Sequence, residues 1–189
     1  MDFLQGIDNG NYYHWQHRQT PFLQGLAIVA SQLGGYLPSI IFIVLTLGLL
    51  FYQGRTRHAW FALLFLLGGF FLVEVVRFTV HRPRPPMAEQ LLGSGKSSSS
   101  FPSSTLFLAA MAWGLLVLAV EDSLSKRWMY WLVHFVAAAW VLLLGFCLFY
   151  LGLHFLSDAV ASWALALVLL LHCRHWAGQH QPADKGQTP

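Results

Sequence analysis

The stretch QTPFLQGLAIVASQLGGYLPSIIFIVLTLGLLFYQG, residues 19–54, contains no charged residue. A transmembrane helix needs about 20 apolar residues, so this stretch is too long for one untilted span. A Gly-Gly pair at 34–35 and Pro38 interrupt it, and such residues mark breaks. We therefore predict a shallow or interfacial helix over residues 21–33 and a first span over residues 36–53. Whether residues 21–33 insert deeply is left open.

Four more apolar stretches follow, at residues 58–78, 103–120, 128–148 and 155–173. Hydrophobic residues make up 56% of the 189-residue chain and charged residues only 10%, whereas about a quarter of the residues in a soluble domain are charged. A chain this short cannot bury so much apolar surface in one core surrounded by water. The expected fold class is therefore all-α, a polytopic membrane helical bundle of about five transmembrane helices plus an N-terminal interfacial helix.

The chain is expected to form a single membrane-embedded domain, residues 1–189. A polar N-terminal segment occupies residues 1–20, and a polar tail occupies residues 174–189. The net charge is only +3, and most basic residues lie between the apolar stretches. A nucleic-acid interface would instead need a concentrated basic patch. The expected partners are therefore membrane lipids and not nucleic acid.

Five crossings place the loop between spans two and three on the same face as the loop between spans four and five. The basic residues on that face are Arg18, Arg77, Arg82, Arg84 and Lys96. Those on the opposite face are Arg55, Arg57, Lys126, Arg127, Arg174 and Lys185. With three loop-face arginines set aside as site residues, the positive-inside rule places the opposite face in the cytoplasm. The site then lies near the outer face of a plasma or inner membrane.

Ionisable residues inside membrane spans are costly and by default indicate function. Glu74, Arg77, His134 and Asp158 lie in the spans and His154 stands at the start of the last one, and all except His134 lie near the loop face. His154 and Asp158 are four residues apart, so they share one side of a helix. Asp158 can accept the imidazole Nδ1 proton and leave Nε2 free as a nucleophile. A purely structural hydrogen bond between two buried polar groups accounts for the spacing equally well. His134 is best interpreted as a packed, neutral histidine.

Two further groups of residues suit an anionic ligand. Arg77 and Arg84 can form a fork around a phosphate, because guanidinium donors match anionic oxygens. The alternative is that Arg77 pairs with Glu74 while Arg82 and Arg84 meet lipid headgroups. The segment Phe101-Pro102-Ser103-Ser104-Thr105 opens the third span, and a helix N-terminus with hydroxyl groups is an anion site. Taken alone, that segment is equally well an ordinary capped helix start.

Together these residues follow a known order. Arg77-x6-Arg84-Pro85, then Pro102-Ser103-Ser104-Thr105, then Tyr150-Leu151-Gly152-Leu153-His154-x3-Asp158 resembles the signature K-x6-R-P, P-S-G-H and S-R-x5-H-x3-D. That signature belongs to the type 2 phosphatidic acid phosphatase family, which is related to the vanadium haloperoxidases. The resemblance implies a membrane phosphohydrolase or phosphotransferase that acts on lipid phosphates or diphosphates, including isoprenyl phosphates. It implies no metal and no other cofactor.

The resemblance also implies roles for individual residues. His154 attacks phosphorus to form a phosphohistidine, and Asp158 orients it. The residues implied to bind the phosphoryl oxygens are Arg77, Arg84 and Ser103, with Ser104 and Thr105 beside them. Arg77 stands where the family has lysine, which keeps the charge and changes the donor geometry.

Two positions depart from the signature. Thr105 stands where the family has its general-acid histidine, and Leu148 stands where the third motif has its arginine. A positioned acid contributes about 10²–10⁴-fold in rate, so either His81 or Arg82 substitutes, or the leaving group needs no acid. The alternative function is a catalytically impaired relative that binds lipid phosphate or scaffolds a membrane partner. A transporter is disfavoured because the ionisable groups cluster at one face.

Overall fold

All regular structure in the described ranges is helical. The computed structural model describes residues 2–86 and 99–178, and it contains no β-strand within them. The elements in chain order are α1 (Asp2–Gln16), α2 (Pro21–Leu33), α3 (Tyr36–Tyr52), α4 (Thr56–Val80), α6 (Ser104–Val120), the 3-10 turn η1 (Glu121–Ser123), α7 (Arg127–Tyr150) and α8 (Leu156–Gly178). The all-α fold class expected from the sequence is confirmed.

Each predicted apolar stretch forms a helix. By length and composition α4, α6, α7 and α8 can each cross a membrane, and α2 and α3 together qualify as one span bent by 41°. The described residues therefore provide up to five spans, as predicted. The predicted bounds hold to within about two residues, except that α8 continues to Gly178 instead of ending near Cys173.

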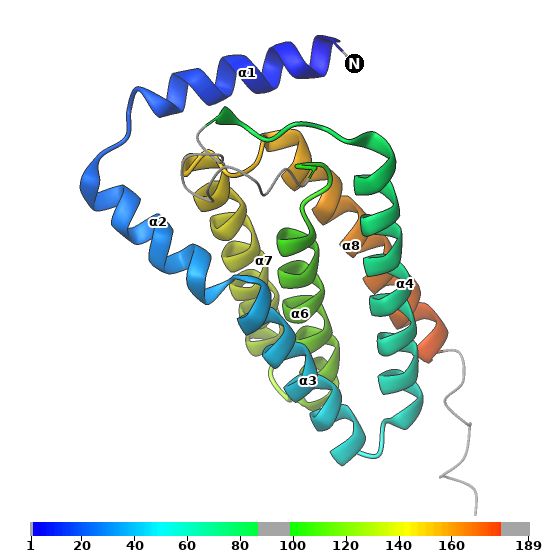
Figure 1. The fold of residues 1–189 in the computed structure, drawn as a ribbon. Coiled ribbons are helices and arrows are strands. Elements are labelled where there is room, and N and C mark those ends of the chain that lie inside the picture. The colour runs from blue at the N-terminus through cyan, green and yellow to red at the C-terminus, as the bar shows by residue number, and fades with distance from the viewer. Residues whose placement is uncertain (1, 87–98, 179–189) are drawn as a thin grey trace, which may run out of the picture.

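The break between α2 and α3 lies at the predicted glycine pair. A Cβ atom on Gly34 would lie 2.6 Å from Cδ2 of Leu144 on α7, and one on Gly35 would lie 2.9 Å from the carbonyl oxygen of Ser31. A Cβ at residue 35 would press on backbone atoms, and one at residue 34 would displace the Leu144 side chain, so glycine suits both positions. α2 runs down the outside of α7, and α3 continues from mid-height toward the lower end of the bundle (Figure 1). α2, expected at the interface, thus forms the first part of a bent pair.

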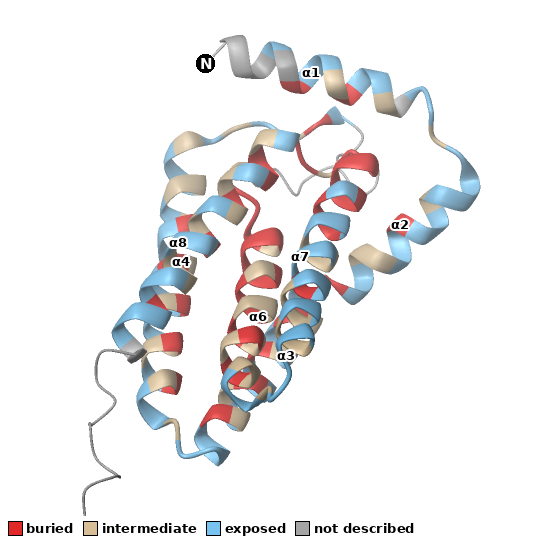
Figure 2. Ribbon diagram, turned by 180° about the vertical axis from the view of Figure 1, so that it is seen from behind, coloured by how far each residue is buried: buried red, intermediate tan, exposed pale blue. Residues whose placement is uncertain are grey.

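α6 is the central helix of the bundle. More than half of it is buried, compared with about a third or less of α4, α7 and α8, and Figure 2 shows buried residues along its whole length. The outer faces of the surrounding helices carry large exposed apolar side chains, among them Phe22, Phe71, Phe78 and Phe135. So much exposed apolar surface is unfavourable in water and matches the hydrocarbon of a bilayer.

The two ends of the bundle carry different loops. Residues 81–86 and 151–155 meet at the end below α1 (Figure 1). At the opposite end, Nη2 of Arg55 lies 2.9 Å from Oδ2 of Asp122, and its Nη1 donates to two carbonyl groups at the end of α6. The parity inferred from the sequence, with the α4–α6 and α7–α8 connections at one end and the α3–α4 and α6–α7 connections at the other, is confirmed.

α1 is an element that the sequence did not lead us to expect. This helix lies across the end of the bundle, above the end of α7 and the start of α8 (Figure 1). The Tyr12 ring packs edge-on against Phe155 with ring centroids 6.2 Å apart, and Trp15 packs edge-on against Phe146 of α7 at 5.5 Å. A largely polar helix is stable when one face is buried by tertiary contacts, and its composition gives little sign of that.

Candidate active site

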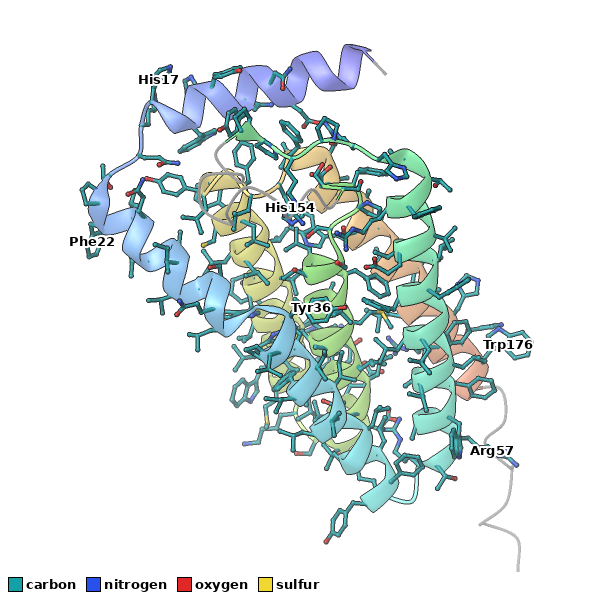
Figure 3. The ribbon with its side chains drawn as sticks, viewed as in Figure 1. His17, Phe22, Tyr36, Arg57, His154 and Trp176 are labelled. Atoms are coloured by element: carbon teal, nitrogen blue, oxygen red, sulfur yellow. The ribbon has the colours of Figure 1, made fainter. Side chains whose placement is uncertain are left out.

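The predicted site residues gather at the end of the bundle covered by α1. Three segments converge there: residues 81–86 after α4, residues 99–103 before α6, and residues 151–155 between α7 and α8. They supply Arg84, Ser103 and His154, and the adjoining helix ends supply Arg77, Ser104, Thr105 and Asp158. His154 lies in the third segment, directly beneath α1 (Figure 3). Each segment leaves a helix end at this point, so the charged side chains can meet without lying in the apolar middle of the bundle.

His154 is buried and held on both ring nitrogens. Its Nδ1 lies 3.1 Å from the carbonyl oxygen of Ser100, and its Nε2 lies 3.2 Å from Oγ of Ser103. A carbonyl oxygen only accepts, so Nδ1 carries the proton and donates to it, and Nε2 accepts from the Ser103 hydroxyl. Burial, and then the nearby charge of Arg84, lowers the pKa of His154 below 6.5 despite the opposing effect of Asp158. Nε2 therefore presents a lone pair at neutral pH.

Asp158 lies next to His154 but is not its nearest acceptor. Its Oδ2 is 3.6 Å from Nδ1 of His154, farther than the Ser100 carbonyl. The same Oδ2 accepts from the backbone amide of Phe155 at 2.9 Å, which is half of a capping box at the start of α8. The other oxygen, Oδ1, accepts from Nη1 of Arg82 at 2.9 Å. Asp158 is fully buried, so its charge acts on the imidazole with little screening.

Arg77 joins the end of α4 to the start of α6. Its Nη1 donates to Oε1 of Glu74 at 2.9 Å and to Oγ of Ser104 at 2.8 Å, and its Nε and Nη2 donate to the carbonyl oxygen of Ser99. The pairing with Glu74 is the one that the alternative interpretation of the sequence proposed. The contact with Ser104 nevertheless places the guanidinium at the N-terminus of α6.

Arg84 is the second guanidinium near His154. Its Nη1 lies 3.4 Å from the carbonyl oxygen of Leu153, the residue before His154. Burial, and then the positive charge of Arg77, lowers the pKa of Arg84 below its usual range. The two partly buried guanidinium groups repel each other. An anion bound between them would relieve that repulsion, so the site favours an anionic ligand.

Ser103 begins α6 and anchors it to α8. Its Oγ accepts from the backbone amide of Leu106 as a helix N-cap, and its own backbone amide donates to Oγ of Ser162 at 2.9 Å. Ser162 in turn donates to the carbonyl oxygen of Asp158 at 2.7 Å. The helix N-terminus, with its partial positive charge, is thereby fixed beside Nε2 of His154.

His134 lies away from this cluster. Its Nδ1 lies 2.9 Å from the carbonyl oxygen of Tyr130, and its Nε2 lies 3.6 Å from Oε2 of Glu121. Glu121 begins the 3-10 turn at the opposite end of the bundle. The interpretation of His134 as a packed histidine with no part in the site agrees with this position.

Three residues of the site escaped sequence reasoning. Asp8 of α1 is buried and its Oδ2 accepts from Nη2 of Arg82 at 2.7 Å, Ser100 supplies the carbonyl that orients His154, and Ser157 donates to Asp8. Asp8 carried one usable signal, since it and Asp2 are the only acidic residues before Glu74. Backbone carbonyls and surface-type serines carry no signal of this kind.

The sequence also matches a known protein family, which is independent support for the order of these groups along the chain. A family model described as the PAP2 superfamily matches residues 57–182. The chain belongs to the PAP2 superfamily. Its fold is similar to the crystal structure of a transmembrane PAP2-type phosphatidylglycerolphosphate phosphatase from Bacillus subtilis, with a TM-score of 0.83 and 22% sequence identity over 97% of this chain and 90% of that one. A search among curated proteins found no match.

As a PAP2 protein whose helices are long and apolar enough to cross a membrane, the chain is an integral membrane protein with a lipid-phosphatase fold. The match confirms the family inferred from the motifs. It covers the three motif segments and leaves out α1, α2 and α3, which come before residue 57.

The two departures from the PAP2 signature have different surroundings. Thr105 lies half-buried in the first turn of α6, close to the anchored Ser103. Leu148 is almost fully buried and packs in an apolar cluster with Leu106, Leu144 and Ala159. A threonine hydroxyl does not act as an acid at neutral pH, and a leucine supplies no charge. At these two positions the chain therefore carries neither the histidine nor the arginine of the signature.

The two suggested substitutes have other contacts. The exposed His81 caps the end of α4 in a left-handed conformation, with its ring centroid 5.4 Å from that of Phe78. Arg82 has both terminal nitrogens on carboxylates, Asp158 and Asp8, and its guanidinium carbon lies 4.4 Å from the centroid of the Phe155 ring. These geometries favour neither side chain as the missing acid or phosphate ligand.

Proposed function

We propose that this PAP2 protein is a membrane phosphohydrolase that cleaves lipid phosphates through a phosphohistidine, with a preference for leaving groups of low pKa. One observation carries the proposal. The lone pair of His154 Nε2 faces the N-terminus of α6 at Ser103, and the partly buried cation Arg84 lies close enough to lower the pKa of that ring. A neutral nucleophile in a positively charged site suits attack on an anionic phosphoryl group.

The first step forms a bond between Nε2 of His154 and phosphorus and breaks the bond to the leaving oxygen. Before it, the incoming phosphoryl group displaces the Ser103 hydroxyl from Nε2. Arg77, Arg84 and Ser103 hold the phosphoryl oxygens, with Ser104 and Thr105 beside them. The imidazolium that develops keeps its Nδ1 proton on the Ser100 carbonyl, and the buried Asp158 carboxylate offsets its charge.

In the second step, water attacks phosphorus and the P–N bond breaks. The water loses a proton to solvent, inorganic phosphate leaves, and His154 returns to its starting state. Attack on phosphorus requires mainly positioning and charge neutralisation. The side chains already at the site supply both.

The leaving-group preference follows from Thr105. When a diphosphate is cleaved, the leaving group is a phosphate that departs without a proton, whereas the alkoxide of a monoester requires one. A missing acid costs about 10²–10⁴-fold for the second class and little for the first. Isoprenyl diphosphates and other lipid diphosphates are therefore the favoured substrates.

The decisive experiment measures phosphate release by the purified, detergent-solubilised protein. Isoprenyl diphosphate and isoprenyl monophosphate share one apolar chain and differ in the leaving group, so they form a matched pair. Phosphatidic acid and phosphatidylglycerol phosphate extend the panel, and His154→Ala is the control. Faster release from the diphosphate that is lost in His154→Ala supports the proposal, and release that survives in the variant contradicts it.

A second candidate function is lipid-phosphate binding without turnover, and the apolar environment of Leu148 favours it. It predicts no phosphate release from any member of the panel and normal binding by His154→Ala. It also predicts that Arg84→Ala abolishes binding of a radiolabelled lipid phosphate. Release by the wild-type protein excludes it.

We place the site near the outer face of a plasma or inner membrane. With Arg77, Arg82 and Arg84 set aside as site residues, Arg18 is the basic residue left at the site end of the described chain, whereas the opposite end carries Arg55, Arg57, Lys126, Arg127 and Arg174. On that count, the positive-inside rule favours the cytoplasm for the opposite end. Lys96 and Lys185, which also entered the charge comparison, lie outside the described residues. Labelling of single cysteines by a membrane-impermeant maleimide in intact cells tests this: Asn9→Cys reacts and Lys126→Cys does not if the placement is right.

A further inference from the structure

Asp8 is a buried carboxylate on a helix that the family match does not include. Only 3% of its surface is exposed, although it comes from a polar segment at the start of the chain. Its Oδ2 accepts from Nη2 of Arg82 at 2.7 Å and from the Ser157 hydroxyl, and its Oδ1 accepts from the Ser157 backbone amide at 3.2 Å. Burying a charged carboxylate costs free energy, so such a group is found buried only when its oxygens have hydrogen-bond or ion-pair partners.

We propose that Asp8 is a positioning residue for the His154–Asp158 pair, and that α1 is therefore part of the active site. This inference rests on the proposed function of that pair. Asp8 does not touch the reacting atoms, and it acts through Arg82 and through the start of α8.

The first route runs through the guanidinium of Arg82. Nη2 donates to Asp8 while Nη1 donates to Oδ1 of Asp158 at 2.9 Å, so one planar group joins the two carboxylates. The Phe155 ring supports the guanidinium 4.4 Å from its centroid. With one face supported and both ends bonded, the orientation of Arg82 is fixed. Loss of Asp8 frees one end of it.

The second route is electrostatic. One guanidinium shared by two carboxylates leaves the group with a net negative charge, so Asp158 retains the capacity to stabilise an imidazolium at His154. Without the charge of Asp8, Arg82 neutralises Asp158 alone. Charges at these distances interact strongly because the site is buried. The other charged group that acts on His154 is Arg84, in the segment that also carries Arg82, and Arg77 on α4 acts in turn on Arg84.

The third route runs through α8. Asp8 accepts the backbone amide and the hydroxyl of Ser157, in the first turn of the helix that carries Asp158. An acidic group there satisfies an otherwise free amide and is favoured by the helix dipole. The contact ties α1 to the helix that sets the position of Asp158.

The test compares Asp8→Asn with Asn9→Ala, a neighbouring exposed position on α1. We expect Asp8→Asn to lower kcat about tenfold with KM changed by less than about twofold, because orientation and charge change while phosphate contacts remain. The acid limb of kcat/KM should move to lower pH, because a negative charge near His154 is lost. Asp8→Glu should restore part of kcat, and Asn9→Ala should leave both constants unchanged.

The direction of the pH shift separates positioning from general loosening. Detachment of α1 would let water reach His154, reduce the burial that lowers its pKa, and move the acid limb to higher pH. A double-mutant cycle with Arg82→Gln adds a second criterion. If Asp8 acts through Arg82, the double variant loses little more than Arg82→Gln alone. An acid limb displaced upward, additive losses, or a higher kcat in Asp8→Asn would each overturn the proposal.

An NMR titration of ¹³C-labelled histidines gives a readout that needs no turnover. The His154 signal is assigned by its disappearance in His154→Ala, and its pKa should be lower in Asp8→Asn than in the wild type. If the wild type releases no phosphate, the proposed function fails while this measurement still tests the position of Asp8. An unchanged or raised His154 pKa in Asp8→Asn, at an unchanged unfolding midpoint, contradicts the inference.

Discussion

Nε2 of His154 lies 3.2 Å from Oγ of Ser103. The two residues come from different helix ends, and the contact joins the start of α6 to the loop between α7 and α8. Ser103 also caps α6 and is anchored to Ser162. The nucleophile and the helix N-terminus therefore form one unit, and the predictions below follow from it.

The pH dependence of turnover should reflect a neutral His154. Burial lowers its pKa below 6.5, so the imidazole loses its proton at a lower pH than a free histidine does. Activity should therefore rise with pH through an acid limb centred below 6.5 and stay level toward neutral pH. The measurement is kcat/KM against pH for the best substrate of the panel. A midpoint at or above 6.5 would contradict the assigned nucleophile.

Replacement of His154 should abolish turnover and spare the fold. His154→Ala removes the attacking atom, so phosphate release should fall by at least about 10³-fold. The site residues Arg77, Arg84 and Ser103 are retained, and binding of a lipid phosphate should stay within about tenfold of the wild type. Phosphate release and ligand binding on the same preparation check both halves of this expectation.

Replacement of Arg77 by lysine, the residue of the family signature, should lower kcat/KM less than replacement by a neutral residue. Arg77→Lys keeps the charge and loses part of the bidentate geometry, so we expect a loss of less than about tenfold in kcat/KM. Arg77→Ala leaves Glu74 without its partner and removes a phosphate contact, so we expect a loss of about 10²-fold or more. Steady-state kinetics of the two variants test this. Equal losses would indicate that Arg77 serves structure alone.

Thr105 should control which leaving groups are accepted. Thr105→His introduces an acid at the family position in the first turn of α6, so release from isoprenyl monophosphate should rise by about 10²-fold. Release from isoprenyl diphosphate should change little, because its leaving group needs no proton. The informative quantity is the ratio of the two rates before and after the substitution. A rise for both substrates alike would remove the basis of the proposed preference.

Close packing between α7 and α8 should make Gly145 intolerant of side chains. A Cβ atom there would lie 2.1 Å from the Trp163 ring, whereas one on Gly48 of α3 meets nothing within 4 Å. Gly145→Ala should therefore destabilise the bundle by about 1–3 kcal/mol. Gly48→Ala should be neutral or slightly stabilising, because alanine favours helix. Thermal unfolding in the same detergent compares the two. Similar midpoints would contradict the packing argument.

The family, the helices and the end of the bundle at which the candidate site residues gather could be predicted from the sequence. Long apolar stretches in a chain with few charges have one stable solution, which is helices in lipid, because each backbone polar group must be satisfied within its own segment. The break at Gly34–Gly35 could also be predicted, because a glycine pair within an apolar stretch is a local signal of a helix end. The positions of Arg77, Arg84, His154 and Asp158 at one end followed from counting crossings, since parity requires no side-chain detail.

Only the tertiary structure decided how these residues act on one another. The Ser100 carbonyl, and not Asp158, is the nearest acceptor for the His154 proton, because the path of residues 99–103 depends on packing between α6 and α8. Asp8 reaches Arg82 only because α1 folds across the end of the bundle. A contact between residues 74 positions apart leaves no trace in local composition or spacing. Its energy comes from burial and charge pairing, and both arise only when the helices are assembled.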